Sequence, residues 1–483
     1  MTLDVRRRTT WRNHTGNQSC QPLGVGSPAS LDDILEVVAT ARREHVTVRA
    51  VGSGHSWSDV ALTGGFLLRP DRLAGPLPLD PAGLRHPRPE RLRRFQGGTR
   101  IRELNEHLWA DGLALPNMGG YDGQTIAGVV STSTHGSGLR FGPLCDLVRS
   151  LDLVTGTGRR VRLEPRDGPT APTPGGRTSD GWELVHDDDL FAAALVGMGC
   201  MGVAYAVTLE VRDRFALTES RTLTTWEEVR GDLLDGAPAL RDRDHWELLL
   251  SPYAPDGVHR CVVTSRVPAE PGYEPEGADR RRPWVTELLA QLPITHGVMD
   301  LVLDFDPDGT PEAMDQALEG IADREYTDRS YRVFNIGAAN LMPAYSSEIG
   351  IALEGDLPVR AVERVFEVAE RYARVGDIYA TAPFSLRFVK ASPALLSMMH
   401  GRDTMMIELI MQTDTEGGFE LLAAYERALH ELGGRPHWGQ VNDLTERALG
   451  ELYPALPTWR AARRELDPDG VFDAPFTTRT GLS

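Results

Sequence analysis

The stretch VGSGHSW at residues 51–57 decides how the first half of this chain folds. It follows a strand-like segment, VTVRAV, and places two glycines and two serines around one histidine, His55. Consecutive backbone N–H groups in such a turn can form a concave nest that binds a pyrophosphate. The turn therefore indicates a phosphate-bearing cofactor with His55 beside it. The alternative is a structural or solvent-facing histidine, which is the commoner role in a glycine-rich turn.

A second segment, GGYDGQTIAGVVSTSTHGSG at residues 119–138, is built almost entirely from small residues. Such a composition is typical of a flexible linker. However, Ile126, Ala127, Val129 and Val130 interrupt the polar residues, so we expect the segment to be packed. Buried backbone without regular pairing needs hydrogen-bond partners, and a polar cofactor would supply them.

Residues 197–202, GMGCMG, match the pattern G-x-G-x-x-G of dinucleotide-binding turns. That pattern requires the order strand, turn, helix, so that the phosphates meet the helix N-terminus. Here the helix-like DDDLFAAALVGMG leads into the turn and the strand-like VAYAVTLEV follows it. We interpret the segment as a helix-to-strand turn and not as a nicotinamide site, although its glycines let a cofactor approach the backbone.

The pattern of the chain changes after Asp213. Before this point, residues 28–51 and 94–114 each predict a helix and a strand, with Ser30 as the N-cap of the first helix. From 216 to 430, strands and helices alternate at a coarser spacing, which predicts an antiparallel sheet covered by helices. One of the predicted strands is YRVFNI at 331–336. We therefore expect an α+β fold with two main domains.

The composition argues against nucleic acid and membranes as partners. The 483 residues include 69 Asp and Glu against 51 Lys and Arg, and the formal net charge of −18 repels both polyanions. The chain has no run of 18 apolar residues, and no apolar stretch follows its N-terminal arginines, so we expect a cytoplasmic protein. Four scattered cysteines indicate neither disulfides nor a zinc site, and we predict no metal: Cys20, Cys145, Cys200 and Cys261.

Together these segments resemble the vanillyl-alcohol oxidase superfamily of FAD enzymes, in particular its sugar-lactone and alditol oxidase (aldonolactone oxidase) branch. The resemblance runs from TWRNHTGNQSCQP near the N-terminus to GGRPHWGQ and LDPDGVFDAPF near the C-terminus. Its most specific part is the GSGHS turn followed by THGSG. It implies a two-subdomain FAD-binding domain at residues 1–213 and an antiparallel-sheet cap domain for the substrate at 214–432. The segment 433–483 would return to the FAD-binding domain.

The resemblance also implies which residues hold the cofactor. His55 matches the histidine that bonds to the flavin 8α-methyl group in this branch. Relatives with a second tether carry a cysteine where this chain reads LALPN at residues 113–117, so we expect a single tether. The other implied cofactor-binding residues are Val51, Gly52, Ser53, Gly54 and Ser56 at the pyrophosphate, Thr125, Ser131, Ser133, His135, Gly136, Ser137 and Gly138 along the flavin, and Val203 at the adenine end.

Two departures from the branch concern its substrate site. The usual Glu-x-Arg reads Ser385-Leu-Arg387 here, and the usual lysine after His-Trp-Gly is Gln440. An amide cannot act as a base near neutral pH, whereas a lysine with a lowered pKa can. The substrate is therefore expected to be less polar than a sugar, such as a specialised-metabolism intermediate, unless Ser385 and Gln440 rebuild a similar hydrogen-bond network.

The implied reaction is an oxidation of a CH–OH or CH–NH group. Hydride would pass from the substrate carbon to flavin N5, and O2 would then reoxidise the flavin to give H2O2. We expect Arg387 to stabilise developing negative charge and His437 to accept a proton. One alternative is an FAD dehydrogenase of a sugar lactone or polyol that uses another acceptor. A second alternative is a flavin-binding protein with little turnover, suggested by the loss of the two charged positions.

Overall fold

The computed structural model describes residues 5–6, 9–270, 273, 307–336 and 343–483. The first half of the chain contributes two sheets. Among the described residues the smaller has the order β1 (Val5–Arg6), β4 (Gly24–Gly26), β6 (Phe66–Leu68), β5 (Val48–Ala50). The larger has the order β12 (Glu183–His186), β11 (Arg160–Glu164), β10 (Val148–Val154), β13 (Val203–Glu210), β8 (Leu92–Gln96), β7 (Pro76–Leu77).

The helix α1 (Leu31–Glu44) leads the chain to the turn at 51–57. Its N-cap is Ser30, whose side chain accepts a hydrogen bond from the Asp33 amide, and the Asp33 carboxylate accepts from the Ser30 amide in return. Its buried face packs on the small sheet. The strand β5 follows and ends directly before the turn, so the predicted order of helix, strand and glycine turn is confirmed.

The segment 119–138 is part of the core, as predicted. It contains the short helix α3 (Ile126–Ser131), in which Ile126, Val129 and Val130 are buried. The helix α2 (Ile101–Ala110) precedes the segment, and α4 (Asp188–Leu195) and β13 enclose the turn at 197–202. The order helix, turn, strand around GMGCMG is therefore also as predicted.

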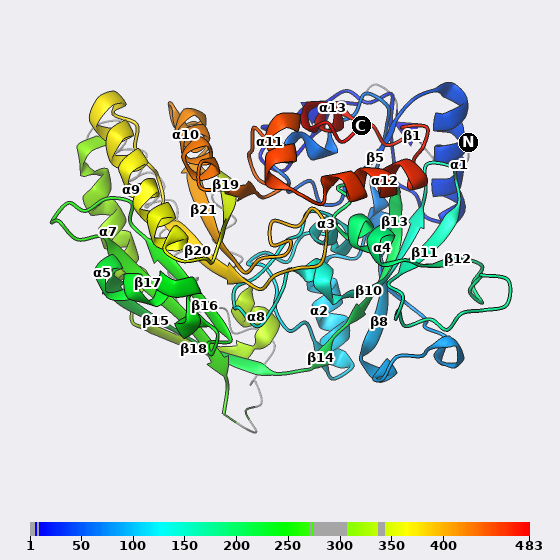
Figure 1. Ribbon diagram of the computed structural model, residues 1–483, viewed down its shortest axis with the longest axis horizontal. Helices are drawn as coiled ribbons and strands as arrows, with labels where there is room; N and C mark the ends of the chain where they lie inside the picture. The colour runs from blue at the N-terminus through cyan, green and yellow to red at the C-terminus, as the bar shows by residue number, and fades with distance from the viewer. Residues whose placement is uncertain (1–4, 7–8, 271–272, 274–306, 337–342) are drawn as a thin grey trace.

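The second half of the chain builds an antiparallel sheet, which confirms the predicted arrangement. Helices α7 (Thr310–Ile321), α9 (Leu357–Gly376) and α10 (Gly418–His430) lie on its outer side (Figure 1). Leu386 and Ile407 pack beneath α9, so the side chains that alternate with them face the first half of the chain. The strand order within the described residues is β18 (Arg324–Arg329), β15 (Ala216–Thr225), β17 (Arg260–Pro268), β16 (His245–Leu250), β20 (Phe384–Val389), β21 (Thr404–Gln412), β19 (Ala344–Ala352), β22 (Arg435–Pro436).

One predicted strand is wrong. YRVFNI was expected to extend at 331–336, but Ser330–Phe334 form the helix α8, and the edge strand is the preceding β18. Tyr331, Val333 and Phe334 are all buried in the helical turn. A short apolar run does not distinguish a strand from a buried helix. Here the burial of these side chains in the tertiary structure favours the helix.

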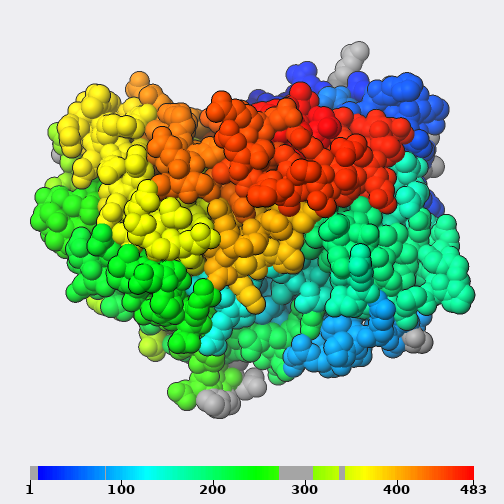
Figure 2. All heavy atoms as spheres, viewed as in Figure 1, coloured from blue at the N-terminus to red at the C-terminus, as the bar shows by residue number. Residues whose placement is uncertain are grey.

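The C-terminal segment returns to the first half of the chain. After β22 the chain forms α11 (Glu446–Leu452), α12 (Leu456–Leu466) and α13 (Pro475–Thr480), of which α12 and α13 lie over the first half of the chain (Figure 1). The Val48 amide donates to Val471 O at 2.8 Å, and Trp459 Nε1 donates to Val196 O at 3.1 Å. In the space-filling view this segment spans both halves of the molecule (Figure 2). The boundaries at 213 and 432 stay predictions.

Within the described part of the chain, every helix is too short or too polar to cross a membrane.

Candidate functional site

A large cavity in the first half brings the glycine-rich segments together. Its empty volume is about 1200 Å³, including space open to solvent. The turn at 51–56, the helix α3 and the turn at 197–203 all line it, although they are far apart in the sequence. Nine of the predicted cofactor-binding residues lie in its wall: Val51, Gly52, Ser53, Gly54, His55, Ser56, Thr125, Ser131 and Val203.

The turn at 52–56 has the properties of an anion-binding nest. Its five backbone N–H groups donate no hydrogen bond to any described residue. Buried or half-buried amides normally find an acceptor, so the turn is open to one from a ligand. Gly54 has φ +71°, and a Cβ on Gly52 would lie 2.1 Å from Thr125 Oγ1. Glycine at these positions therefore keeps the nest open, and a diphosphate fits the nest.

The imidazole of His55 lies in the wall of this cavity between two other rings. The His14 ring stacks on it with a centroid distance of 4.3 Å, and the Tyr121 ring lies at 4.3 Å with a tilt of 45°. Burial, and then the charges of His14 and Arg102, lower the pKa of His55 to about 4. The ring is therefore neutral at physiological pH and keeps a lone pair for bond formation.

The remaining predicted cofactor residues lie between this cavity and the large antiparallel sheet. Ser133 Oγ is 2.8 Å from Ser397 Oγ, and the Gly138 amide donates to Phe388 O at 2.6 Å. The Ser137 hydroxyl donates to Trp246 O and accepts from the Phe388 amide. Ser133 and Gly138 thus join the two halves of the protein, whereas Gly136 and Ser137 also line a second cavity.

The second cavity lies where segments of the first half meet the sheet. Its empty volume is about 300 Å³, which suits a small substrate. Its wall combines charged, amide and apolar side chains. They belong to Asn117, Met118, Gly120, Gly136, Ser137, Glu247, Arg266, Phe334, Ile336 and Arg387.

Arg387 is surrounded by three glutamates from three strands. Its Nη1 lies 2.9 Å from Glu408 Oε2 and 3.7 Å from Glu348 Oε1, and its Nε lies 3.8 Å from Glu247 Oε2. Glu247 also pairs with Arg266 at 3.0 Å. Burial alone would raise the pKa of Glu247, but Arg266 and Arg387 outweigh burial and lower it to about 2. The site therefore holds fixed negative charge at neutral pH.

Ser385 and Gln440 lie at the same cluster, as the sequence motifs suggested. Ser385 Oγ donates to Glu408 Oε2 at 3.2 Å, and Ser346 Oγ donates to Gln440 Oε1 at 2.5 Å. Sequence analysis missed the three glutamates. A signal was present, because each is the one acidic residue inside an otherwise apolar strand pattern, HWELLL, SSEIGIA or TMMIELIM. Charges at inward positions of buried strands point to a functional site.

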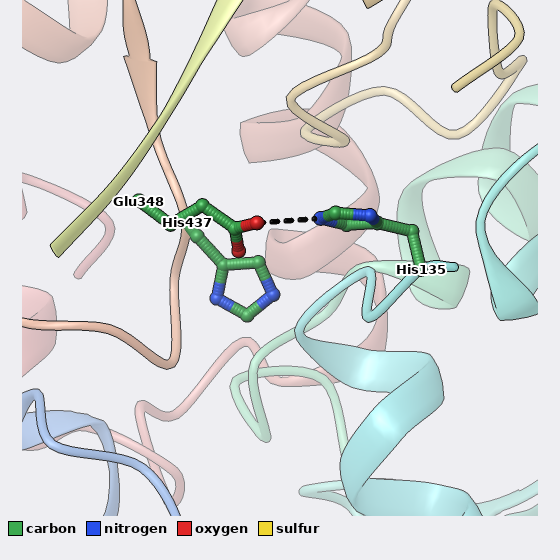
Figure 3. Close-up of side chains that lie close together, drawn as sticks. All are labelled: His135, Glu348 and His437. Atoms are coloured by element: carbon green, nitrogen blue, oxygen red, sulfur yellow. Dashed lines mark ion pairs between the residues drawn. The ribbon is translucent and has the colours of Figure 1, made fainter. Parts of the chain in front are cut away.

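His135, Glu348 and His437 form a buried cluster (Figure 3). Arg387 is next to it, through Glu348. His135 Nε2 lies 3.3 Å from Glu348 Oε1, and the ligand atoms of the three side chains lie within 4.8 Å of one another. This spacing resembles a metal site. However, His437 Nδ1 accepts a hydrogen bond from the Gly439 amide at 3.0 Å, so the proton of the neutral ring is on Nε2. Neither nitrogen of the His437 ring then offers a free lone pair, so the cluster lacks the third ligand atom that this spacing suggests.

The same hydrogen bond bears on the catalytic role of His437. Burial lowers the pKa of His437 to about 4, against the opposing effect of the Glu348 charge. The ring is therefore neutral near pH 7, and its free polar atom is the Nε2–H donor. Its role as proton acceptor stays a prediction from the sequence, and the neutral ring has no acceptor atom to spare.

A second buried histidine, His245, predicts how stability depends on pH. Burial, and then Arg266, lower the pKa of His245 to about 4 from 6.5. Between these two values the unfolded chain binds a proton that the folded chain does not, so stability falls as pH falls. Going from about pH 7 to pH 5 should cost about 2 kcal/mol through this residue.

The variant His245→Gln tests this prediction, because its amide can still donate to Ser137 O, the atom 3.1 Å from His245 Nδ1. We expect its melting temperature to change less than that of the wild type across this pH interval. An equal change in both proteins would contradict the assignment.

Two family models match the chain. The model of the FAD binding domain matches residues 22–164, and that of D-arabinono-1,4-lactone oxidase matches residues 207–480. A full-length relative is L-gulono-1,4-lactone dehydrogenase of Mycobacterium tuberculosis, 29% identical over 97% of this chain and 98% of that protein. Alditol oxidase of a Streptomyces species is also 29% identical, with the same coverage. L-gulonolactone oxidase of Mus musculus is 26% identical over 96% of each chain.

A solved structure shares the fold. Cholesterol oxidase from B. sterolicum superimposes with a TM-score of 0.77 over 99% of this chain and 97% of that one, at 15% sequence identity. This likeness concerns the architecture, namely a cofactor domain combined with an antiparallel sheet. Together with the matched models and the cavity at residues 51–56, it leads to one conclusion. The chain is an FAD-dependent oxidoreductase and belongs to the D-arabinono-1,4-lactone oxidase family.

Proposed function

We propose that the protein oxidises a CH–OH group of a small polyhydroxylated compound, such as an aldonolactone or an alditol, with FAD as hydride acceptor. The observation that carries this proposal is the Arg387 cluster: Arg387 and Glu247 line the second cavity, and Glu348 and Glu408 contact Arg387 from behind this lining. Carboxylates accept hydrogen bonds from hydroxyl groups, and the guanidinium stabilises negative charge on a substrate oxygen. FAD, when bound, supplies the two-electron acceptor.

The substrate class differs from the less polar compound expected from Ser385 and Gln440. Glu408 lies 3.2 Å from Ser385 Oγ and supplies a carboxylate to the same place from the neighbouring strand. The names of the relatives, which refer to sugar lactones and alditols, support the same class. A CH–NH substrate has no comparable support. Because the charged site is retained, nothing favours a binding protein with little turnover.

The proposal includes a covalent bond between His55 and the flavin 8α-methyl group. The nest at 52–56 would hold the diphosphate, and the neutral His55 ring beside it has the lone pair that the bond requires. A single tether is proposed, because the described cysteines lie elsewhere: Cys145 and Cys200 are buried and outside the lining of this cavity.

Dioxygen is the proposed electron acceptor, which would give H2O2, and the cytoplasm is the proposed location. Relatives named oxidase support the acceptor, and the free state of the four cysteines supports a reducing compartment. The name of the M. tuberculosis relative, a dehydrogenase, keeps a different acceptor as the alternative.

Anaerobic mixing with a substrate panel tests the proposed function. The panel contains aldono-1,4-lactones and alditols, with primary amines as the comparison. We expect a lactone or alditol to bleach the visible flavin absorbance, and air to restore it with stoichiometric H2O2. Bleaching without recovery in air would identify a dehydrogenase. Bleaching by amines alone would contradict the proposed substrate class.

A further inference from the structure

The three glutamates around Arg387 differ in their other partners. Glu247 also pairs with Arg266, and Glu348 also contacts His135. Among the described residues, the cationic partner of Glu408 is Arg387, and its other contacts are the hydroxyls of Ser385 and Ser346. Glu348 has 3% of its side chain exposed, whereas Glu247 and Glu408 each have 14%. Of these two partly exposed carboxylates, Glu408 is the one that is not also held by Arg266.

The strand register makes the position of Glu408 unfavourable for stability. Glu408 on β21 lies directly opposite Glu348 on β19 and directly opposite Ser385 on β20. Like charges directly opposite each other in a sheet destabilise it. Arg387, two residues after Ser385 on the same face of β20, offsets this repulsion by contacting both carboxylates. Two opposed glutamates kept at one half-buried guanidinium indicate a role in binding or catalysis.

We propose that Glu408 is the catalytic residue that binds the reacting hydroxyl of the substrate and accepts its proton. This inference rests on the proposed function of CH–OH oxidation. The O–H proton moves to a Glu408 carboxylate oxygen while the C–H hydrogen leaves with its electron pair to the flavin, and a C=O bond forms. Arg387, 2.9 Å from Glu408 Oε2, stabilises the negative charge that develops on the substrate oxygen.

The geometry explains why this role falls to Glu408. The neutral His437 ring has no free acceptor atom, and Gln440 is an amide whose oxygen already accepts from Ser346. Glu348 is buried, and its contacts with His135 and Arg387 outweigh its burial and lower its pKa to about 2. Such a carboxylate is a weak proton acceptor near neutral pH.

The substitution Glu408→Gln keeps the shape of the side chain and removes its charge. We expect kcat to fall by about 100-fold or more, as for loss of a general base. The flavin content should be unchanged. The melting temperature should change little, because Arg387 keeps Glu247 and Glu348 as partners and Glu348 loses a like-charged neighbour, which offsets the loss of the Arg387–Glu408 pair. If Glu408 were only structural, kcat would stay within threefold of the wild-type value.

Moving the carboxylate across the strand pair provides a gain-of-function test. Ser385 and Glu408 are register partners, so the double variant Ser385→Glu/Glu408→Ser returns one carboxylate and one hydroxyl to the site. We expect it to regain at least tenfold in kcat over Glu408→Ser alone. A double variant that binds flavin and melts like the wild type, yet is no faster than Glu408→Ser, would overturn the proposal.

Turnover of the wild-type protein distinguishes a failure of this inference from a failure of the proposed function. If no lactone or alditol bleaches the wild-type flavin, the proposed function fails. If the wild type turns over and Glu408→Gln does so equally well, the reaction stands and the inference about Glu408 is wrong.

Discussion

Replacing His55 with alanine is expected to abolish covalent flavin. The acid-stable flavin fraction should fall from near completeness to none, because alanine offers no nucleophile to the cavity at residues 51–56. FAD should still bind reversibly, since the backbone amides of the nest are unchanged. We expect kcat to fall by more than about tenfold, equivalent to about 1.4 kcal/mol of transition-state free energy. Acid precipitation followed by visible spectroscopy of pellet and supernatant measures the first effect, and stopped-flow reduction measures the second.

The neighbouring ring of His14 provides the matched control. It stacks on His55 at 4.3 Å, so His14→Phe keeps an aromatic ring in the stack and removes a competing imidazole. This variant should retain its acid-stable flavin. Covalent flavin that survives His55→Ala but is lost in His14→Phe would show that the bond is on His14, and would contradict the assignment to His55.

Replacing Arg387 with methionine is expected to have the second large effect. The substitution removes the positive charge shared by Glu247, Glu348 and Glu408. Loss of one partner of a buried ion pair costs about 3–5 kcal/mol of folding free energy. Loss of the charge that faces the substrate oxygen should lower kcat by about 100- to 1000-fold. Melting temperature, flavin content and kcat measured together check both parts.

The variant Arg387→Lys separates charge from geometry. A lysine restores the positive charge but not the planar guanidinium group, which contacts several carboxylates at once. We expect it to recover most of the stability and only part of kcat. Wild-type turnover in Arg387→Met would rule out a role for this residue in the reaction, whatever its stability.

The elements that the sequence predicted well are those with local causes. The N-cap at Ser30, the strand before residue 51 and the glycine turn all depend on neighbours within a few residues. The antiparallel sheet also followed from its alternating pattern. The segment YRVFNI was predicted wrongly, because six residues of mixed apolar character fit both a strand and a helix. Burial of Tyr331 and Phe334 favours the helix here.

The site was predictable where it depends on motifs and not where it depends on strand register. His55 and Arg387 stand in recognisable motifs, so they could be named from the sequence. Glu247, Glu348 and Glu408 come from strands separated by up to 161 positions along the chain. Their meeting at Arg387 follows from pairings such as Ser385 with Glu408, and pairing register is a property of the folded sheet. Serine at position 385, where the family usually has glutamate, therefore looked like the loss of a charge. Glu408 on the neighbouring strand supplies a carboxylate instead.

The visible spectrum of the purified protein before and after acid precipitation tests the central claim most directly. That claim is an FAD enzyme whose flavin is attached at His55 beside the nest at residues 52–56. We expect flavin absorbance in the native protein that stays with the washed, denatured pellet. Flavin released entirely into the supernatant would contradict the attachment, and a protein that neither carries flavin nor takes up added FAD would contradict the assigned cofactor site as a whole.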